Sequence, residues 1–464
     1  MFDLKIINAR IVTASDTFEA ELGILAGRIE AVSRGTLGDA KETIDAMGRY
    51  VLPGGIDTHT HLDMPFGGTV SADDFYTGTV AAACGGTTTI IDFAMQGKGE
   101  SLSSAVERWK AKAQDKAVVD YGFHVAITEC TDAVIEELGT LAGLGVTSVK
   151  LFMAYKGALM VSDEILYRVM QRASGTGVLT MVHAENGDVI DHLSRRLQGE
   201  GKLEPKYHAA SRPSILEGEA TGRALALAYA ASKAPLFVVH LTCREALDEL
   251  TKAQRRGQPA FAETCPQYLL LTSERYDEAD FGGAKYVMSP PLREKADCEA
   301  LWSALFSGAI HTVGSDHCPF NFRGQKTLGK DNFALIPNGA PGIETRLPLM
   351  FSEGPRRGRI SLNRFVEVVS TAPAKLFGLY PRKGAIAPGS DADIVILEPK
   401  STQTLSAKTL HQNVDYCPYE GMEIAGRVRT VLSRGTPIVK HGRFIGKRGT
   451  GQFVERRPFD ISIA

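Results

Sequence analysis

Eight apolar, β-branched runs alternate with helix-like stretches between residues 52 and 379, and this alternation constrains the fold more than any other feature. We expect strands at residues 51–58, 87–94, 120–127, 146–152, 178–183, 236–241, 259–264 and 311–315. Helix start and stop residues mark the stretches 101–114, 131–145, 162–177 and 244–257. The pattern predicts an α/β fold with a closed (β/α)8, TIM-like barrel. A doubly wound open sheet is the alternative, because one sequence does not reveal the strand order.

The two ends of the chain have a different pattern. Residues 1–51 and 380–445 contain short strand-like runs separated by Gly-Arg and Gly-Thr turns. We expect both parts to pair into one small β-sandwich domain beside a barrel of residues 52–379. Residues 446–464 lack hydrophobic periodicity, and we expect them to form a tail that packs on another surface or at a subunit interface.

Polar residues end several of the apolar runs, and the carboxyl ends of barrel strands meet at one mouth. The first run ends in His59 and His61, whose spacing in an extended strand points both imidazoles to one side. Taken alone, such a pair is more often exposed or hydrogen-bonded than a metal site. The other runs add Lys150, His183, His240 and Asp316. We interpret the set as a metal centre, because separate core histidines would not all fall at strand ends.

Lys150 is the unusual member of this set. Its neighbours Val149, Leu151 and Phe152 indicate burial, which is costly for an ammonium, and a metal ion would repel that charge. A neutral amine that captured carbon dioxide would become a carbamate, an anionic two-oxygen bridge between two metal ions. The alternative is a lysine that forms a salt bridge with a buried acid.

Composition excludes several classes of partner. The chain has 52 Lys and Arg against 54 Asp and Glu, a formal net charge of −2, which argues against a nucleic-acid partner. It has neither a signal-like start nor an apolar run long enough for a bilayer, so we expect no membrane partner and a soluble, cytoplasmic protein. Seven cysteines lie far apart, and we expect small core residues rather than disulfides; Cys318 is noted because it follows Asp316 and His317.

Longer motifs carry a family resemblance. They are GGIDTHTHLDMPF, ACGGTTTIIDFA, VKLFMAYKG, VHAEN, HLTC, ETCPQYLLL, MSPPLR, GSDHCPF, IPNGAPGIETR and APAKLFGLYPRKG. With the strand-end residues, they resemble the dihydropyrimidinase and D-hydantoinase family of cyclic amidohydrolases, within the amidohydrolase superfamily. The resemblance extends from the first strands to about Phe453.

The resemblance implies a hydrolase that acts on C–N bonds of cyclic amides. A small cyclic ureide or imide, either a dihydropyrimidine or a 5-substituted hydantoin, would be opened to an N-carbamoyl amino acid by a metal-bridging hydroxide. The family uses two divalent ions, usually Zn²⁺, although manganese or cobalt can substitute. His59 and His61 would bind the more buried ion, His183 and His240 the other, and N6-carboxylated Lys150 would bridge them. Asp316 would be both ligand and catalytic proton carrier. A homotetramer, or a dimer, is implied.

The resemblance also implies the substrate-binding residues. Tyr155 would donate to the oxyanion, and backbone groups of Ser289 and Asn338 would hold the ureide. The residues themselves suggest a substrate lid in the loop after the first strand, where Met64 and Phe66 precede the flexible Gly67-Gly68. With Phe152 and Leu159, these side chains would form an apolar wall around the exocyclic substituent of the ring.

Three related functions are the alternatives. Dihydroorotase has an arginine soon after the HxH pair to hold a carboxylate, whereas Leu62 and Asp63 follow here. Allantoinase shares the metal ligands, and only the KLFMAYKG context around Tyr155 favours hydantoins or dihydropyrimidines over allantoin. A non-catalytic scaffold of the same fold, like the collapsin response mediators, would have lost ligands, and this chain has all six.

Overall fold

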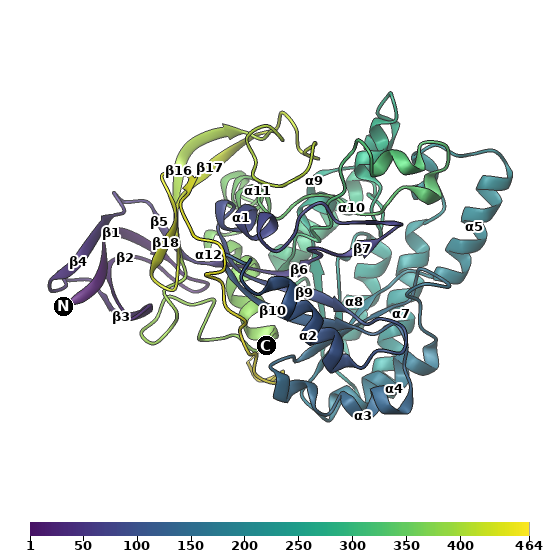
Figure 1. The fold of residues 1–464 in the computed structure, drawn as a ribbon, viewed down its shortest axis with the longest axis horizontal. Helices are drawn as coiled ribbons and strands as arrows, with labels where there is room; N and C mark the ends of the chain where they lie inside the picture. The colour runs from purple at the N-terminus through teal and green to yellow at the C-terminus, as the bar shows by residue number, and fades with distance from the viewer. Residues whose placement is uncertain (464) are drawn as a thin grey trace.

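Eight parallel strands form a nearly closed barrel in the computed structural model, which describes residues 1–463 (Figure 1). They are β6 (Gly55–Thr60), β9 (Thr87–Met95), β10 (Asp120–Ala126), β11 (Ser148–Phe152), β12 (Leu179–His183), β13 (Leu236–Val238), β14 (Ala260–Thr264) and β15 (Thr312–Val313). The last strand approaches the first just beyond β15, where the His61 amide donates to the His317 carbonyl at 2.9 Å. The predicted barrel is confirmed, and the open-sheet alternative is wrong.

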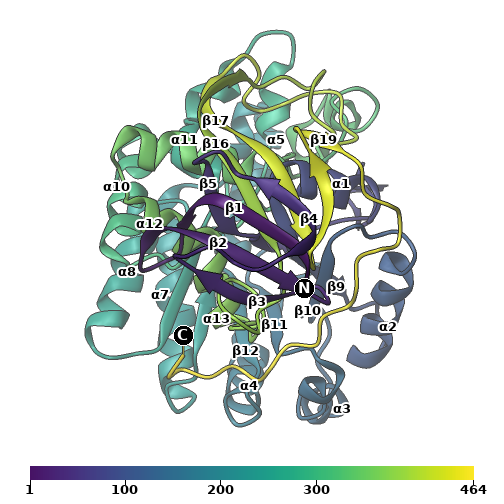
Figure 2. The ribbon, with the colours of Figure 1, turned by 90° about the vertical axis from the view of Figure 1, so that its left-hand side faces the viewer.

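A second, largely antiparallel sheet joins the two ends of the chain (Figure 2). Its nine strands are β1 (Phe2–Val12), β2 (Thr17–Leu25), β3 (Arg28–Ser33), β4 (Ala40–Asp45), β5 (Tyr50–Pro53), β16 (Ile394–Thr404), β17 (Glu423–Ser433), β18 (Thr436–Lys440) and β19 (Arg443–Phe444). Strand β5 lies between β1 and β16, so it connects the amino-terminal and carboxyl-terminal parts. The small β domain made from both chain ends is therefore confirmed.

The strand predicted at 51–58 is two strands, because the chain passes from one sheet to the other at Gly54. The Gly54 amide donates to Asp393 in the small domain at 2.8 Å, and the Gly55 amide donates to Gly86 beside the barrel at 2.9 Å. A Cβ on Gly54 would lie 2.0 Å from the Thr88 hydroxyl oxygen. This crossing point therefore has no room for a side chain, and β6 starts after it.

Helices surround the barrel, most of them on its outside (Figure 1). They are α1 (Thr77–Cys84), α2 (Leu102–Ala113), α3 (Asp132–Glu137), α4 (Asp163–Ser174), α5 (Gly187–Gly199), α6 (Lys206–Ala210), α7 (Ser214–Ala230), α8 (Arg244–Arg255), α9 (Pro266–Leu270), α10 (Lys295–Ser307), α11 (Arg346–Glu353), α12 (Leu362–Val366) and α13 (Ala372–Leu376). The predicted caps Ser101, Thr131 and Ser162 each accept a backbone N–H. The helix expected at 131–145 breaks at Gly139 into α3 and a 3-10 turn. In the described chain, no helix is long and apolar enough to cross a membrane.

The barrel interior below the mouth is filled by apolar side chains. Phe93, Met181 and Phe237 belong to one buried cluster, which continues into α13 and Val454 at the amino ends of the strands. Because packed side chains occupy this volume, the barrel is not a pore. Any chemistry is therefore confined to the opposite, carboxyl end.

The carboxyl-terminal segment runs across the amino ends of the barrel strands (Figure 1). Its backbone donates from Gly451 to Ala117 and from Val454 to Tyr121, at 2.9 and 2.8 Å. Arg456 is 3% exposed and donates to the Ser148 hydroxyl at 2.9 Å. The expected tail thus packs on its own barrel, while a subunit contact of this segment stays a prediction.

Candidate functional site

One cavity opens at the carboxyl end of the barrel strands. It is lined by His61, Met64, Phe66, Met95, Lys150, Phe152, Tyr155, Leu159, His183, His240, Ser289, Asp316, Cys318, Asn338 and Gly339. The structure therefore brings together every predicted site residue except His59, which lies fully buried directly beneath.

His59, His61 and Asp316 form the first group of donors. The two histidines lie at the end of β6, and strand alternation places both rings on the inner side. Their Nε2 atoms lie 3.2 and 3.4 Å from Asp316 Oδ1. Burial lowers the pKa of both imidazoles. Burial alone would raise the pKa of Asp316, but its contacts with the histidines lower it to about 2. Neutral imidazoles thus face an ionised carboxylate.

His183 and His240 form the second group, at the ends of β12 and β13. Nδ1 of His183 lies 2.9 Å from Nε2 of His240, so the two nitrogens face each other across the cavity floor. The other nitrogen of His183 lies 2.8 Å from Glu185 Oε2. Because a carboxylate accepts the proton on Nε2, the Nδ1 lone pair is left toward the cavity.

Lys150 lies between these two groups on β11. It is 1% exposed, and its Nζ lies 3.0 Å from His59 Nε2 and 4.3 Å from the centre of the Phe93 ring. Within residues 1–463 it forms no ion pair, so the salt-bridge alternative does not describe it. Burial lowers the pKa of the Lys150 amine to about 8. A neutral amine, the form that reacts with carbon dioxide, is therefore accessible near neutral pH.

Glu263, at the end of β14, supports the first group from below. It is fully buried, with Oε1 2.6 Å from His59 Nδ1 and Oε2 accepting from the Thr58 hydroxyl at 2.9 Å. Burial raises the pKa of Glu263 to about 7. The contact fixes the proton on Nδ1 and aims Nε2 of His59 at the cavity. Glu263 was missed from the sequence, although it ends the seventh predicted run as the histidines end theirs.

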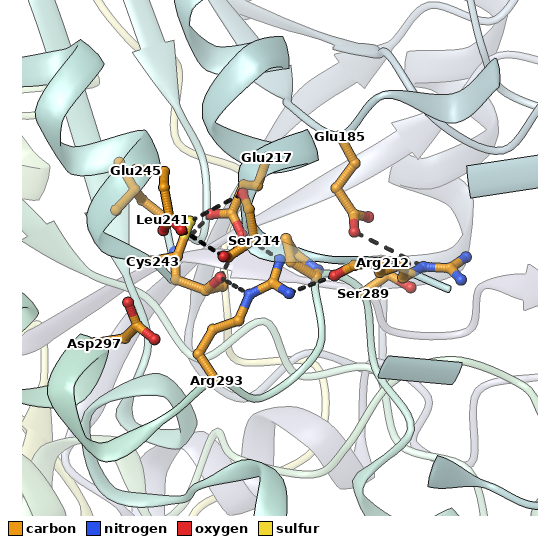
Figure 3. A network of polar contacts seen from close by, with 12 residues as sticks. Glu185, Arg212, Ser214, Glu217, Leu241, Cys243, Glu245, Ser289, Arg293 and Asp297 are labelled. Atoms are coloured by element: carbon orange, nitrogen blue, oxygen red, sulfur yellow. Dashed lines mark hydrogen bonds and ion pairs between the residues drawn. The ribbon is translucent and has the colours of Figure 1, made fainter. Parts of the chain in front are cut away.

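A buried ionic network supports the second group (Figure 3). Arg293 donates to Glu217 at 2.8 Å, and Glu217 accepts the amide of Thr242, two residues after His240. Figure 3 shows Glu185 and Arg212 facing each other beside this network, with Arg212 Nε 3.8 Å from Glu185 Oε1. The loops after β12 and β13 are therefore held by opposite charges from outside the cavity.

Tyr155, Ser289 and Asn338 also line the cavity, and with Gly339 we call them its polar wall. Asn338 Nδ2 donates to the Ser289 hydroxyl at 3.0 Å. Burial raises the pKa of Tyr155, so its hydroxyl stays protonated and able to donate. Tyr155 has φ of 66°, a strained value for a side chain of this size that turns the chain sharply after β11.

The predicted lid is a short hairpin of β7 (Pro65–Phe66) and β8 (Thr69–Val70). The Phe66 ring meets the Tyr155 ring edge to face at 5.6 Å, and Met64 packs with Cys318 and Phe320. Met95, Cys318 and Gly339 also line the cavity and were not predicted as site residues. Burial raises the pKa of the Cys318 thiol, so it lines the wall as a small apolar side chain.

The donor set fits divalent metal ions. The ligand atoms of His59, His61 and Asp316 all lie within 4.8 Å of one another. Four imidazoles, a lysine amine and a carboxylate converge here. Metal ions bind such groups in their deprotonated forms, and burial and mutual contacts favour those forms for His59, His61 and Asp316. A nitrogen-rich set with one carboxylate suits zinc and neighbouring transition metals.

Comparison with known proteins agrees with this geometry. The model of the amidohydrolase family matches residues 50–438. A D-hydantoinase of Geobacillus stearothermophilus is 52% identical over 98% of this chain and 97% of its own, and a D-hydantoinase of Rhizobium radiobacter is 51% identical over 98% and 99%. The crystal structure of a dihydropyrimidinase from Brevibacillus agri NCHU1002 superimposes with a TM-score of 0.97, at 53% identity over 98% of this chain and 99% of that one.

Proposed function

This chain belongs to the amidohydrolase family and is a metal-dependent hydrolase of cyclic amides, and on that premise we propose that its cavity opens 5-substituted hydantoins and dihydropyrimidines to N-carbamoyl amino acids. The observation that carries the proposal is the convergence of His59, His61, Lys150, His183, His240 and Asp316 at a cavity with one apolar and one polar wall.

In this proposal, the two histidine pairs would hold two divalent ions, most simply Zn²⁺. His59 and His61 would hold one ion together with Asp316, and His183 and His240 would hold the other. The neutral Nζ of Lys150 attacks carbon dioxide and releases one proton, which gives N6-carboxylysine between the two pairs. When bound, the ions supply an activated water and polarise the amide carbonyl.

The protein side chains complete the reaction. Asp316 accepts the proton of the attacking water and passes it to the ring nitrogen as the amide C–N bond breaks. The protonated Tyr155 hydroxyl donates to the oxyanion that forms on the attacked carbonyl. Backbone groups of Ser289 and Asn338 hold the ureide, so the ring is oriented before the attack.

The apolar wall selects the ring substituent. Met64, Phe66, Phe152 and Leu159 are apolar residues of the cavity lining, where they would contact an exocyclic phenyl or alkyl group. No basic residue lines this cavity other than Lys150 and the histidines, among the described residues, which argues against a carboxylated ring. Assembly as a homotetramer or dimer and a cytoplasmic location remain part of the proposal, and light scattering of the purified protein tests the former.

Parallel assays test the substrate proposal. The purified enzyme, with its metal content measured by plasma mass spectrometry, is given phenylhydantoin, dihydrouracil, allantoin and dihydroorotate. We expect about two divalent ions per chain and turnover of the first two substrates. Preferential turnover of allantoin or dihydroorotate would overturn the substrate assignment. A chain that binds no divalent ion and stays inactive after reconstitution would instead support the scaffold alternative.

A further inference from the structure

Lys326 is a fully buried lysine whose hydrogen-bond partners, among residues 1–463, are all backbone carbonyls. Its Nζ donates to the carbonyl oxygens of Val287, Pro337 and Gly339 at 2.8, 2.7 and 2.7 Å. It forms no ion pair with any residue in the described part of the chain, although buried charges are usually paired with an opposite charge. Burial lowers the pKa of Lys326 to about 7, and in the charged form three carbonyls use all three ammonium protons while the Phe320 ring lies 5.9 Å from Nζ.

These carbonyls belong to the two segments that form the polar wall. Pro337 and Gly339 flank Asn338, and Val287 lies two residues before Ser289. The Val287 carbonyl also accepts the Gly339 amide at 3.0 Å, so both segments meet at the ammonium. Gly339 has φ of 138°, and a Cβ there would lie 2.3 Å from the Cys318 carbonyl oxygen. The polar wall is therefore tightly packed on the side away from the cavity, and Lys326 connects its two segments.

The ammonium also acts on the peptide groups themselves. The Pro337 carbonyl and the Asn338 amide belong to one peptide unit, so a cation on the carbonyl oxygen makes that N–H a stronger donor. This amide is one of the backbone groups that would hold the ureide under the proposed function. Lys326 is thus placed to strengthen a substrate contact without touching the substrate, since it does not line the cavity.

Gln325, the preceding residue, holds the lid hairpin over the cavity. Its Nε2 donates to the Thr69 hydroxyl at 2.8 Å and to the Val70 carbonyl at 2.7 Å, both in β8 of the lid hairpin. Its Oε1 accepts the Asn321 amide at 2.7 Å. Because β8 pairs with β7, these bonds fix the strand that carries Phe66 over Tyr155.

We propose that Gln325 and Lys326 are positioning residues that hold the two walls of the substrate cavity from one point of the chain. Lys326 orders the polar wall and governs how tightly any ring is bound. Gln325 orders the lid and governs the preference between rings with and without a bulky substituent. The inference deepens the proposed function and rests on it for the identity of the substrates.

Two variants separate these roles. Lys326→Met keeps the length of the side chain but removes its charge and its donors, and Lys330→Met, at an exposed lysine of the same segment, is the matched control. Gln325→Glu keeps the acceptor for Asn321 but removes both donors to the hairpin. Each is prepared as metal-loaded enzyme, and metal content, unfolding temperature, KM and kcat are measured with dihydrouracil and phenylhydantoin.

We expect Lys326→Met to raise KM for both substrates about 10-fold or more, since hydrogen bonds to a charged group are lost. Metal content should stay at the wild-type level, and Lys330→Met should behave as wild type. Gln325→Glu should change the ratio of kcat/KM for the two substrates several-fold. Wild-type KM values in Lys326→Met, or an unchanged ratio in Gln325→Glu, would overturn the corresponding half of the proposal.

A readout without substrate keeps this inference separate from the proposed function. Hydrogen–deuterium exchange of the segments around Ser289 and Asn338 should be faster in Lys326→Met than in Lys330→Met or the wild type. Equal exchange would refute the positioning role even if none of the four ring substrates is turned over. If Lys326→Met does not fold, Lys326→Arg takes its place, because a planar guanidinium keeps the charge but not the threefold geometry.

Discussion

Two buried lysines at opposite ends of the barrel differ in how their charges are paired. At the amino end, Lys383 contacts Asp120 at 2.7 Å and Asp393 at 2.6 Å, and Arg434 also pairs with Asp120. At the carboxyl end, Lys150 has no acidic partner, and Nδ1 of His61 has no hydrogen-bond partner in the part of the chain that is described. Charges that partner one another hold the fold together. Groups that are left without partners are available to a ligand.

The buried lysines make the same comparison within one residue type. Lys383 faces three carboxylates, Lys326 faces three carbonyls, and Lys150 faces an imidazole and two aromatic rings. Their partners thus range from three opposite charges at Lys383, through carbonyl dipoles at Lys326, to no hydrogen-bonded oxygen at Lys150 within the described chain. The partner set, rather than burial, therefore distinguishes a structural lysine from a reactive one.

Replacing Lys150 by Ala tests the unpartnered end most severely. Loss of a residue that only supports a metal ligand lowers metal affinity by up to about 100-fold. Because Lys150 would itself be a ligand, we expect a larger fall in metal affinity and loss of activity. Mass spectrometry and turnover measure this, with Lys156→Ala at a nearby exposed lysine as the control. A short added carboxylic acid should restore part of the activity. Full activity in Lys150→Ala without it would refute the carbamate bridge.

Replacing Lys383 by Met tests the partnered end. Three buried carboxylates would lose their shared cation, and we expect unfolding to become easier by about 3 to 5 kcal/mol. Urea denaturation measures this, and exposed Lys400→Met should have almost no effect. The folded fraction should retain wild-type metal content and kcat. A variant with normal stability but impaired catalysis would reverse the contrast between the two ends.

Replacing Tyr155 by Phe returns to the mouth with a smaller change. The ring contacts with Phe66 and Phe152 stay, while the oxyanion donor is lost. We expect kcat to fall about 100-fold with both metal ions retained. Steady-state kinetics with phenylhydantoin measure this change in kcat. An unchanged kcat would show that Tyr155 only packs at the rim of the cavity.

His311, just before β15 at the amino end, carries the smallest prediction. Burial, together with nearby Arg364, lowers its pKa to about 4. The unfolded chain takes up this proton near pH 6.5, so acidification from there to about pH 4 favours unfolding. When the pH is lowered from 7 to 5, the free energy of unfolding should fall by about 1 kcal/mol less in His311→Asn than in the wild type, after allowance for the partial exposure of His311. Urea denaturation at both pH values measures this, and identical losses would contradict it.

The positions of the site residues could be predicted where these residues lie at the ends of strands. Five of the six donors lie at the ends of apolar runs and Lys150 lies inside one near its end; parallel strands bring those ends together, so the convergence of the donors could be predicted. The break between β5 and β6 at Gly54 could not be predicted, because the lack of space for a side chain there is caused by Thr88, which lies on another strand. Lys326 was also out of reach. Its partners are main-chain carbonyls 11 to 39 residues away. Every residue has a main-chain carbonyl, so no sequence pattern identifies which ones a lysine will contact.

The small sheet has a consequence for how the chain is synthesised. Strands β1 and β5 pair with each other early, but β5 also needs β16, and Arg49 reaches its partner Glu398 across 349 residues. A ribosome therefore releases the first strands long before their neighbours exist, and the edge of β5 stays open while the whole barrel is being made. The segment that crosses the barrel floor is made later still. The small sheet is therefore complete only after the whole barrel has been synthesised, and until then its open edge is exposed to aggregation.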